Sequence, residues 1–228
     1  MIYFDQHITI SQLTHAHLSR ILAETLVIND IPNHLLLPLA IACHYHDHGW
    51  QQWEKAPEIN PKTNAPLDFQ NIDITQHITI WMHSREIASH QDPLVGYLVS
   101  KHNYYLSSLT LANTINESDK ETLLTFQKKE VIIQNQLLSA IQNKPSESQL
   151  NRLQYYLTIA DYLSLIICLN KTNHEKIINE TKLSLHKDNN IFLISLNLKN
   201  PITYTLHGHN LKNKTNWSEK IIIQSTTE

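Results

Sequence analysis

Glycine is scarce in this chain. Its 228 residues include three glycines, Gly49, Gly96 and Gly208, which stand far apart. Phosphate-binding loops and dinucleotide-binding turns need several glycines within a few residues of one another. The sequence therefore excludes both of these nucleotide-binding motifs.

Cysteine is also scarce, with Cys43 and Cys168 as the two thiols. Both stand in apolar stretches with helical spacing, so we expect buried free thiols and no disulfide framework. Such use of cysteine is typical of proteins in a reducing compartment, and we expect the cytoplasm.

The chain has neither an excess of positive charge nor a long apolar run. It contains 18 Lys and Arg against 21 Asp and Glu, and the basic residues are scattered, which predicts no nucleic-acid partner. No segment approaches the roughly 20 apolar residues that cross a bilayer. The first residues lack the basic and apolar segments of a signal peptide. We expect no membrane partner, and nothing in the sequence indicates an oligomeric state.

Helical periodicity dominates up to about residue 175, and alternating apolar residues typical of strands follow it. One further short strand is expected within residues 1–10. The pattern predicts a mainly α protein, with a helical domain at residues 1–175. A small β-rich appendage at residues 176–228 is expected to pack on it.

Capping residues mark the predicted helix boundaries. Gly49 is placed to end the second helix, and a long loop is expected at residues 50–73. Four helix starts are predicted at N-cap patterns: Ser11, Asp92 before Pro93, Ser118 with Glu121, and Ser146 with Gln149.

Histidine is abundant, with 15 copies, and some of them fall on apolar helix faces. His15 lies on the apolar stripe of its helix, whereas His17 lies on a more polar face. His46 also falls on an apolar stripe, and Asp47 stands on the adjoining edge near the helix end. His102 occupies an apolar stripe farther along the chain. These inward positions make the residues candidate ligands or acid–base groups.

Asp161 is the most informative of the inward residues. It falls on the apolar stripe of the last predicted helix, where an unpaired ionised carboxylate would be costly. A metal ion held together with His15, His46 and Asp47 would balance this charge. Two imidazoles and two carboxylates favour a divalent transition ion, namely Fe, Mn, Zn, Ni or Co, over Mg or Ca.

Each of these residues also has a purely structural interpretation. A single inward histidine is more often a hydrogen-bonded core residue than a ligand, and a single aspartate often bonds backbone or water at the core margin. The metal-site interpretation depends on several helices that offer inward groups at once. His77 and His83 share a helix whose apolar face is ambiguous, so the sequence assigns them less firmly.

The order of these residues resembles the HD superfamily of metal-dependent phosphohydrolases. A helix with His15, the segment "LAIACHYHDHG" at a helix end, and Asp161 on a late helix follow that pattern. His48 departs from it, because an apolar residue is usual at that position. The resemblance implies an HD-like helical bundle and one metal ion bound by His15, His46, Asp47 and Asp161.

A narrower resemblance covers most of residues 3–170 and continues loosely into the C-terminal part. The segments "SQLTHAHLS", "HDHGWQQWEKAPEINPKTNAPLDF", "LVSKH" and "DYLSLIIC" are similar to a bacterial family known as domain of unknown function 3891. Asn64 stands where that family usually has glycine. The family has no settled activity, so this resemblance implies a fold and a site and no particular reaction.

The HD resemblance implies hydrolysis of a small phosphate ester or nucleotide by a metal-activated water. Asp47 would orient this water or accept its proton. His102 would hydrogen-bond the leaving oxygen, or would hold a second ion with His77 or His83. One or two ions are therefore expected.

Three residues are predicted to contact the substrate. Trp50 and Asp68 stand in the long loop that follows the "HDHG" segment, and Lys101 precedes His102. Lys101 would offset phosphate charge, whereas Trp50 would form a wall and Asp68 a polar contact. The aromatic residues of this loop fit equally well with a role in pinning it to the helices.

Two other functions fit the same residues. Extra inward histidines at His77 and His102 would permit a di-iron oxygenase, as in myo-inositol oxygenase of the HD superfamily. The lack of an obvious basic phosphate-binding cluster favours a non-catalytic metal-binding or interaction module.

Overall fold

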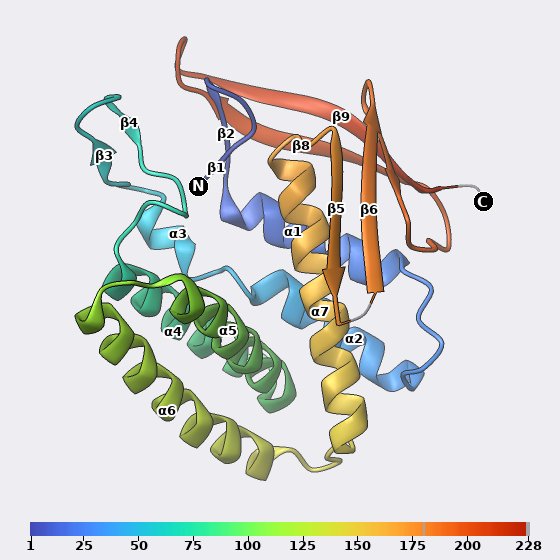
Figure 1. The fold of residues 1–228 in the computed structure, drawn as a ribbon. Helices are drawn as coiled ribbons and strands as arrows, with labels where there is room; N and C mark the ends of the chain where they lie inside the picture. Colours follow the sequence, from blue (N-terminus) through green and yellow to red (C-terminus); the bar gives the residue numbers. More distant parts are fainter. Residues whose placement is uncertain (180, 227–228) are drawn as a thin grey trace.

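The computed structural model describes residues 1–179 and 181–226, and it combines a helical layer with a large sheet (Figure 1). About 51% of the chain is helical and 22% is in strands. None of the described helices is long and apolar enough to cross a membrane. The helices are α1 (Gln12–Thr25), η1 (Asn33–Leu35), α2 (Leu36–Tyr45), α3 (Trp50–Trp53), α4 (Ile74–Ser89), α5 (Pro93–Asn113), α6 (Glu117–Ala140) and α7 (Glu147–Cys168).

Seven of the described strands form one mixed sheet in the order β1-β2-β8-β9-β7-β6-β5. β7 and β9 run parallel, and the other neighbours run antiparallel. β3 and β4 form a separate hairpin. The strands are β1 (Ile2–Tyr3), β2 (Ile8–Ile10), β3 (Ile59–Asn60), β4 (Ala65–Pro66), β5 (Asn173–Ile178), β6 (Thr181–Asp188), β7 (Ile191–Ile194), β8 (Ile202–Asn210) and β9 (Thr215–Ser225).

The prediction of a mainly α protein with a small β appendage is wrong. The sheet is a full layer of the fold, and it recruits both N-terminal strands. Ile8 of β2 lies opposite Asn210 of β8, and Ile10 lies opposite Gly208. The strand expected within residues 1–10 is present as two short strands, because β1 pairs with β2. β2 then pairs with β8, at the far end of the sequence, and local alternation cannot reveal such a partner. The division of the chain at residue 175 stays a prediction.

Three of the four predicted helix starts are confirmed. The side chains of Ser11 and Asp92 accept backbone N–H groups at the starts of α1 and α5, and Ser146 forms a capping box at the start of α7. The start at Ser118 is wrong. The N-cap of α6 is Asn116, whose side chain accepts two N–H groups of the first turn. Asn116 competes well because asparagine is as good an N-cap as serine.

The region around Gly49 also differs from the prediction. α2 ends at Tyr45, and the chain continues through a turn into α3, so Gly49 does not end that helix. Gly49 lies instead against α4, where its N–H donates to Ser84 Oγ at 2.8 Å. A Cβ at this position would stand 2.0 Å from the carbonyl oxygen of Ile80, so the close approach requires glycine. The predicted loop at residues 50–73 contains α3 and the β3–β4 hairpin.

The curled sheet covers one side of α1 and α7, while α4, α5 and α6 form the opposite part of the helical layer (Figure 1). The main core lies between the sheet and the helices that face it. Leu18 and Leu22 of α1, Leu157 of α7 and Phe192 of β7 are fully buried there. Both cysteines are free and buried, which confirms that part of the prediction.

A buried ion pair holds α6 against α4 and α5. Arg85 of α4 pairs with Glu130 of α6, and Ser100 Oγ of α5 donates to Glu130 Oε2 at 2.5 Å. Burial raises the pKa of Glu130, although Ser100 and Arg85 act against that rise. We call Arg85, Ser100 and Glu130 the closed polar cluster, because the charge of each ionised group is balanced within the protein.

Candidate metal centre

Five side chains converge between α1, α2, α5 and α7. His15 comes from α1, His46 and Asp47 from the turn that follows α2, His102 from α5 and Asp161 from α7. We call these five residues the His/Asp centre. His15 and His46 are 1% exposed, and 14% of the Asp161 side chain is exposed. The structure therefore brings together the four predicted metal ligands and His102. His17, in contrast, is exposed, in keeping with its polar helix face.

The donor atoms of four of these residues form a tight group. His15 Nε2 lies 2.9 Å from Asp161 Oδ1, 3.2 Å from His46 Nε2 and 3.6 Å from Asp47 Oδ2. His46 Nε2 lies 3.3 Å from Asp161 Oδ1 and 3.5 Å from Asp47 Oδ2. Ligand atoms about 2.1 Å from one tetrahedral ion stand about 3.4 Å apart. The separations between the two imidazoles, and from each imidazole to each carboxylate, are therefore close to those of ligands that share one ion.

Hydrogen bonds from the outer ring nitrogens fix two of the imidazoles. His46 Nδ1 donates to the carbonyl oxygen of Cys43 at 2.7 Å. Ser164 Oγ donates to the carbonyl oxygen of Asp161, so it accepts from His15 Nδ1 at 2.9 Å. Such outer hydrogen bonds select the tautomer of a metal-binding histidine. When neutral, both rings direct the lone pair of Nε2 at the centre.

The charges of the centre depend on one another. Burial alone would raise the pKa of Asp161, but the imidazoles of His102, His15 and His46 beside the carboxylate hold its pKa well below the ordinary value. Burial alone would lower the pKa of His46, but the Asp47 and Asp161 carboxylates raise it to about 9. The ionised Asp161 therefore needs positive charge beside it. A protonated imidazole supplies this charge in the metal-free protein, and a metal ion can supply it instead.

His102 extends the group on the far side of Asp161. Its Nε2 lies 3.2 Å from Asp161 Oδ2 without an aligned hydrogen bond, and the residue is fully buried. Two overlapping sets of donor atoms, His15–His46–Asp47 and His46–His102–Asp161, each lie within 4.8 Å of one another. These histidine and aspartate groups could hold a metal ion.

A pocket of about 370 Å³ opens beside the centre. His15, His46, Asp47 and Asp161 line it, whereas His102 does not. Most of its remaining wall is apolar. This wall is formed by Trp50, Phe69, Trp81, Leu106, Leu109 and Leu165.

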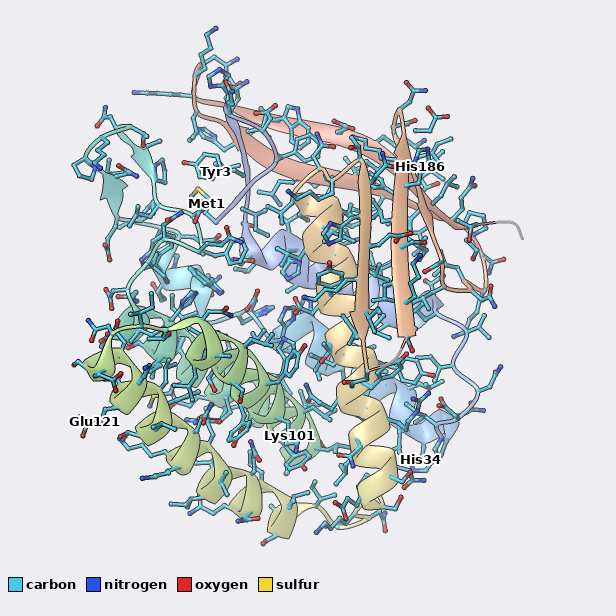
Figure 2. All side chains as sticks on the ribbon, in the orientation of Figure 1. Met1, Tyr3, His34, Lys101, Glu121 and His186 are labelled. Atoms are coloured by element: carbon cyan, nitrogen blue, oxygen red, sulfur yellow. The ribbon has the colours of Figure 1, made fainter. Side chains whose placement is uncertain are left out.

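The predicted substrate contacts lie in different places. Trp50 lines the pocket. Asp68 does not, and its Oδ1 accepts the N–H of Gln70 and the side-chain amide of Asn71, which shapes the turn of its own loop. Lys101 is also absent from the lining, and it lies in the lower part of the view in Figure 2. The structure therefore brings one of the three to the pocket.

His77 lines the pocket, but it does not join the two sets of converging donor atoms. Its ring stacks on Trp81, with centroids 5.0 Å apart, and it meets Trp50 edge-on. Burial lowers the pKa of His77 to about 4. His83 lies outside this pocket, and its side chain is about half exposed.

The loop that carries Phe69 is held by the N-terminal strand. The hydroxyl of Tyr3 donates to the carbonyl oxygen of Pro66 at 2.7 Å. The N–H of Phe69 donates to the carbonyl oxygen of Met1 at 3.1 Å. Figure 2 shows Met1 and Tyr3 between the sheet and the β3–β4 hairpin. The sheet therefore helps to position one wall of the pocket.

Sequence reasoning missed several pocket residues, of which Gln12 is the most informative. It is 2% exposed, it lines the pocket, and its side-chain oxygen has no hydrogen-bond partner. Its spacing gave a signal, because Gln12 stands three residues before His15 on the same helix face. Leu106 and Leu109 likewise continue the face of α5 that carries His102.

A protein family model described as "Protein of unknown function (DUF3891)" matches residues 2–215. Neither a curated protein nor a solved structure matches the chain. The family match includes the whole His/Asp centre and confirms the narrower resemblance that the sequence motifs indicated. The chain therefore belongs to the DUF3891 family.

Proposed function

We propose that this protein is a metal-dependent hydrolase of the HD type that acts on a small phosphate ester. Two overlapping sets of three histidine and aspartate donor atoms beside a pocket carry this proposal. The order along the chain, a histidine, a His–Asp pair and a late aspartate, supports membership of the HD superfamily. The two buried free thiols support a reducing, cytoplasmic setting as part of the proposal.

His15, His46, Asp47 and Asp161 would hold the ion. Their imidazole and carboxylate groups favour Fe, Mn, Zn, Ni or Co. When bound, such an ion supplies Lewis-acid activation of water and of a phosphoryl oxygen.

The protein groups would divide the remaining work. Asp47 lines the pocket, and in this proposal it would accept a proton from the attacking water. His102 lies behind Asp161 and outside the pocket lining, which favours a positioning role over contact with the leaving oxygen. Trp50 and Phe69 would exclude bulk water from the reacting group.

Elemental analysis joined to a hydrolysis assay tests this proposal. We would purify wild type, Asp161→Asn and the exposed-site control Asp188→Asn without chelator or histidine tag. We expect a transition ion in wild type and in Asp188→Asn but not in Asp161→Asn. Hydrolysis of 4-nitrophenyl phosphate and its diester should follow the ion. Loaded wild-type protein that hydrolyses neither ester nor any phosphate ester in a wider panel would contradict the proposal.

A di-iron oxygenase is the second candidate, and the unpaired ring nitrogen of His102 favours it. Its buried Nε2 has no aligned partner, and it belongs to a second set of donor atoms with His46 and Asp161. His77, which lines the pocket, would be the further ligand expected from the sequence. This candidate predicts two irons per chain and consumption of oxygen. One ion per chain and no oxygen uptake would rule it out, and a loaded protein without either activity would be a binding module.

A further inference from the structure

The residues that line the pocket indicate what kind of ligand it could bind. Every lining residue lies in the described part of the chain, and none of them is lysine or arginine. Sites for nucleoside polyphosphates place basic side chains or glycine-rich backbone around the phosphates. Three aromatic residues, Trp50, Phe69 and Trp81, face this pocket instead. Its walls therefore fit an uncharged ring better than a chain of phosphates.

Some polar side chains of the pocket wall already have hydrogen-bond partners within the protein, and one does not. Thr110 Oγ1 donates to the carbonyl oxygen of Leu106 at 3.0 Å, and Asn113 Nδ2 donates to that of Leu109 at 2.8 Å. Both donors are therefore used within α5. The side-chain oxygen of Gln12 is buried and has no hydrogen-bond partner. A buried polar atom without a partner is costly, so a ligand that supplies the missing donor gains affinity.

We propose that the pocket binds a phosphate ester whose leaving group is a small, uncharged, ring-bearing alcohol, and that Gln12 accepts a hydrogen bond from a hydroxyl or amino group on that ring. The volume of about 370 Å³ lies in the range of small-molecule sites. This inference rests on the proposed function and deepens it by naming the class of substrate. It excludes nucleoside polyphosphates.

Calorimetric titration of the metal-loaded protein tests the inference without turnover. The probes are benzylphosphonate, its three ring-hydroxylated isomers and α,β-methylene-ADP, none of which a phosphate esterase hydrolyses. We expect benzylphosphonate to bind about tenfold more tightly than α,β-methylene-ADP, because its ring contacts the aromatic wall. At least one hydroxylated isomer should bind about tenfold more tightly again, through Gln12.

The variant Gln12→Leu should lose the gain of the hydroxylated isomer and keep the affinity for benzylphosphonate. Gln91→Leu, the same change at an exposed site, should keep both. The inference is overturned if α,β-methylene-ADP binds as tightly as benzylphosphonate, if no isomer gains affinity, or if the gain survives in Gln12→Leu.

A metal-free arm separates failure of this inference from failure of the proposed function. Titration with 2-naphthol, followed by tryptophan fluorescence, probes the ring-binding wall without any ion. Saturable quenching is expected, because Trp50 and Trp81 form that wall. Quenching of tryptophan fluorescence in a protein that takes up no metal would contradict the proposed hydrolase but support the ring-binding site. Unchanged fluorescence would overturn the ring site itself.

Discussion

The closed polar cluster and the His/Asp centre both place a carboxylate in the protein interior. In the closed polar cluster, Glu130 pairs with the guanidinium of Arg85 and a hydroxyl, so its charge is balanced by a permanent cation. In the centre, Asp161 is surrounded by imidazoles, which are cations only when protonated. The centre also opens on a pocket, and no described pocket residue is lysine or arginine. The comparison teaches that the first site is neutralised by the protein itself, whereas the second could receive positive charge from outside.

The largest expected effect concerns the closed polar cluster. Arg85→Met leaves Glu130 buried without its cation, and we expect it to lower the free energy of unfolding by about 3–5 kcal/mol. The double variant Arg85→Met/Glu130→Met should recover most of this loss, because no buried charge remains unpaired. Urea denaturation measures both changes. Equal losses in the single and the double variant would show that the ion pair itself is not what holds α6.

The next effect distinguishes the centre from the cluster. A transition ion at about 100 times its Kd should raise the free energy of unfolding of wild type by about 2.7 kcal/mol. Asp161→Asn should respond far less, whereas the double Arg85/Glu130 variant should respond as wild type does. Denaturation with added ion and with chelator measures this difference. If neither the ion nor the chelator changes the unfolding free energy of wild type, the His/Asp centre does not differ from the closed polar cluster in binding an ion.

His102 should have a smaller effect on metal binding. It contacts Asp161 from outside the pocket, and loss of such an outer partner lowers metal affinity about 10–100-fold. We expect His102→Ala to weaken binding in that range, as measured by competition with a chromophoric chelator. His17→Ala is the control, since His17 is exposed and belongs to neither set of donor atoms. Loss of one of two bound ions in His102→Ala would instead make His102 a ligand of the di-iron candidate.

The smallest effect is the pH dependence of unfolding in the metal-free protein. The folded pKa of Asp161 is lowered, so its stabilisation is present above its ordinary pKa and is lost as pH falls through the folded value. The folded pKa of Glu130 is raised, so its favourable contribution is present below its ordinary pKa and is lost as pH rises through the folded value.

Removing the charge of Asp161 and removing that of Glu130 should therefore change the slope of the unfolding free energy against pH in opposite directions. Asp161→Asn should make stability rise less with pH, and Glu130→Gln should make it rise more. Each change is less than about 1.4 kcal/mol per pH unit. Urea titrations over the acid range measure the slopes. Parallel changes in both variants would show that the two carboxylates titrate alike.

Helix periodicity found three residues of the centre, because His15, His102 and Asp161 lie on the apolar faces of their helices. His46 and Asp47 stand just beyond the end of α2. The same rule separated His15 from His17, which stand two residues apart and face different surroundings. The same rule argues against Lys101 as a substrate contact, because residues next to each other on a helix point about 100° apart. Lys101 therefore lies away from the pocket although His102 joins the centre.

The sheet could not be predicted in the same way. β2 has three residues, and its pairing with β8 joins opposite ends of the sequence. Local patterns carry no information about such a partner. Phe69 belongs to the loop that was expected to close over the site, and it does line the pocket. The contacts of its loop with Met1 and Tyr3 could not be predicted, because they join distant parts of the sequence. Residues placed by long-range packing need the folded structure.

The spacing of the centre along the chain also has a consequence for protein synthesis. His15 leaves the ribosome early, whereas Asp161 follows 146 residues later on α7. A nascent chain therefore offers an ion only part of the ligand set until α7 has docked against α1. Because metal affinity depends on the assembled site, tight capture of an ion would follow completion of the helical layer. A chain that stops before α7 would hold its metal weakly and would not withdraw it from the cell's supply.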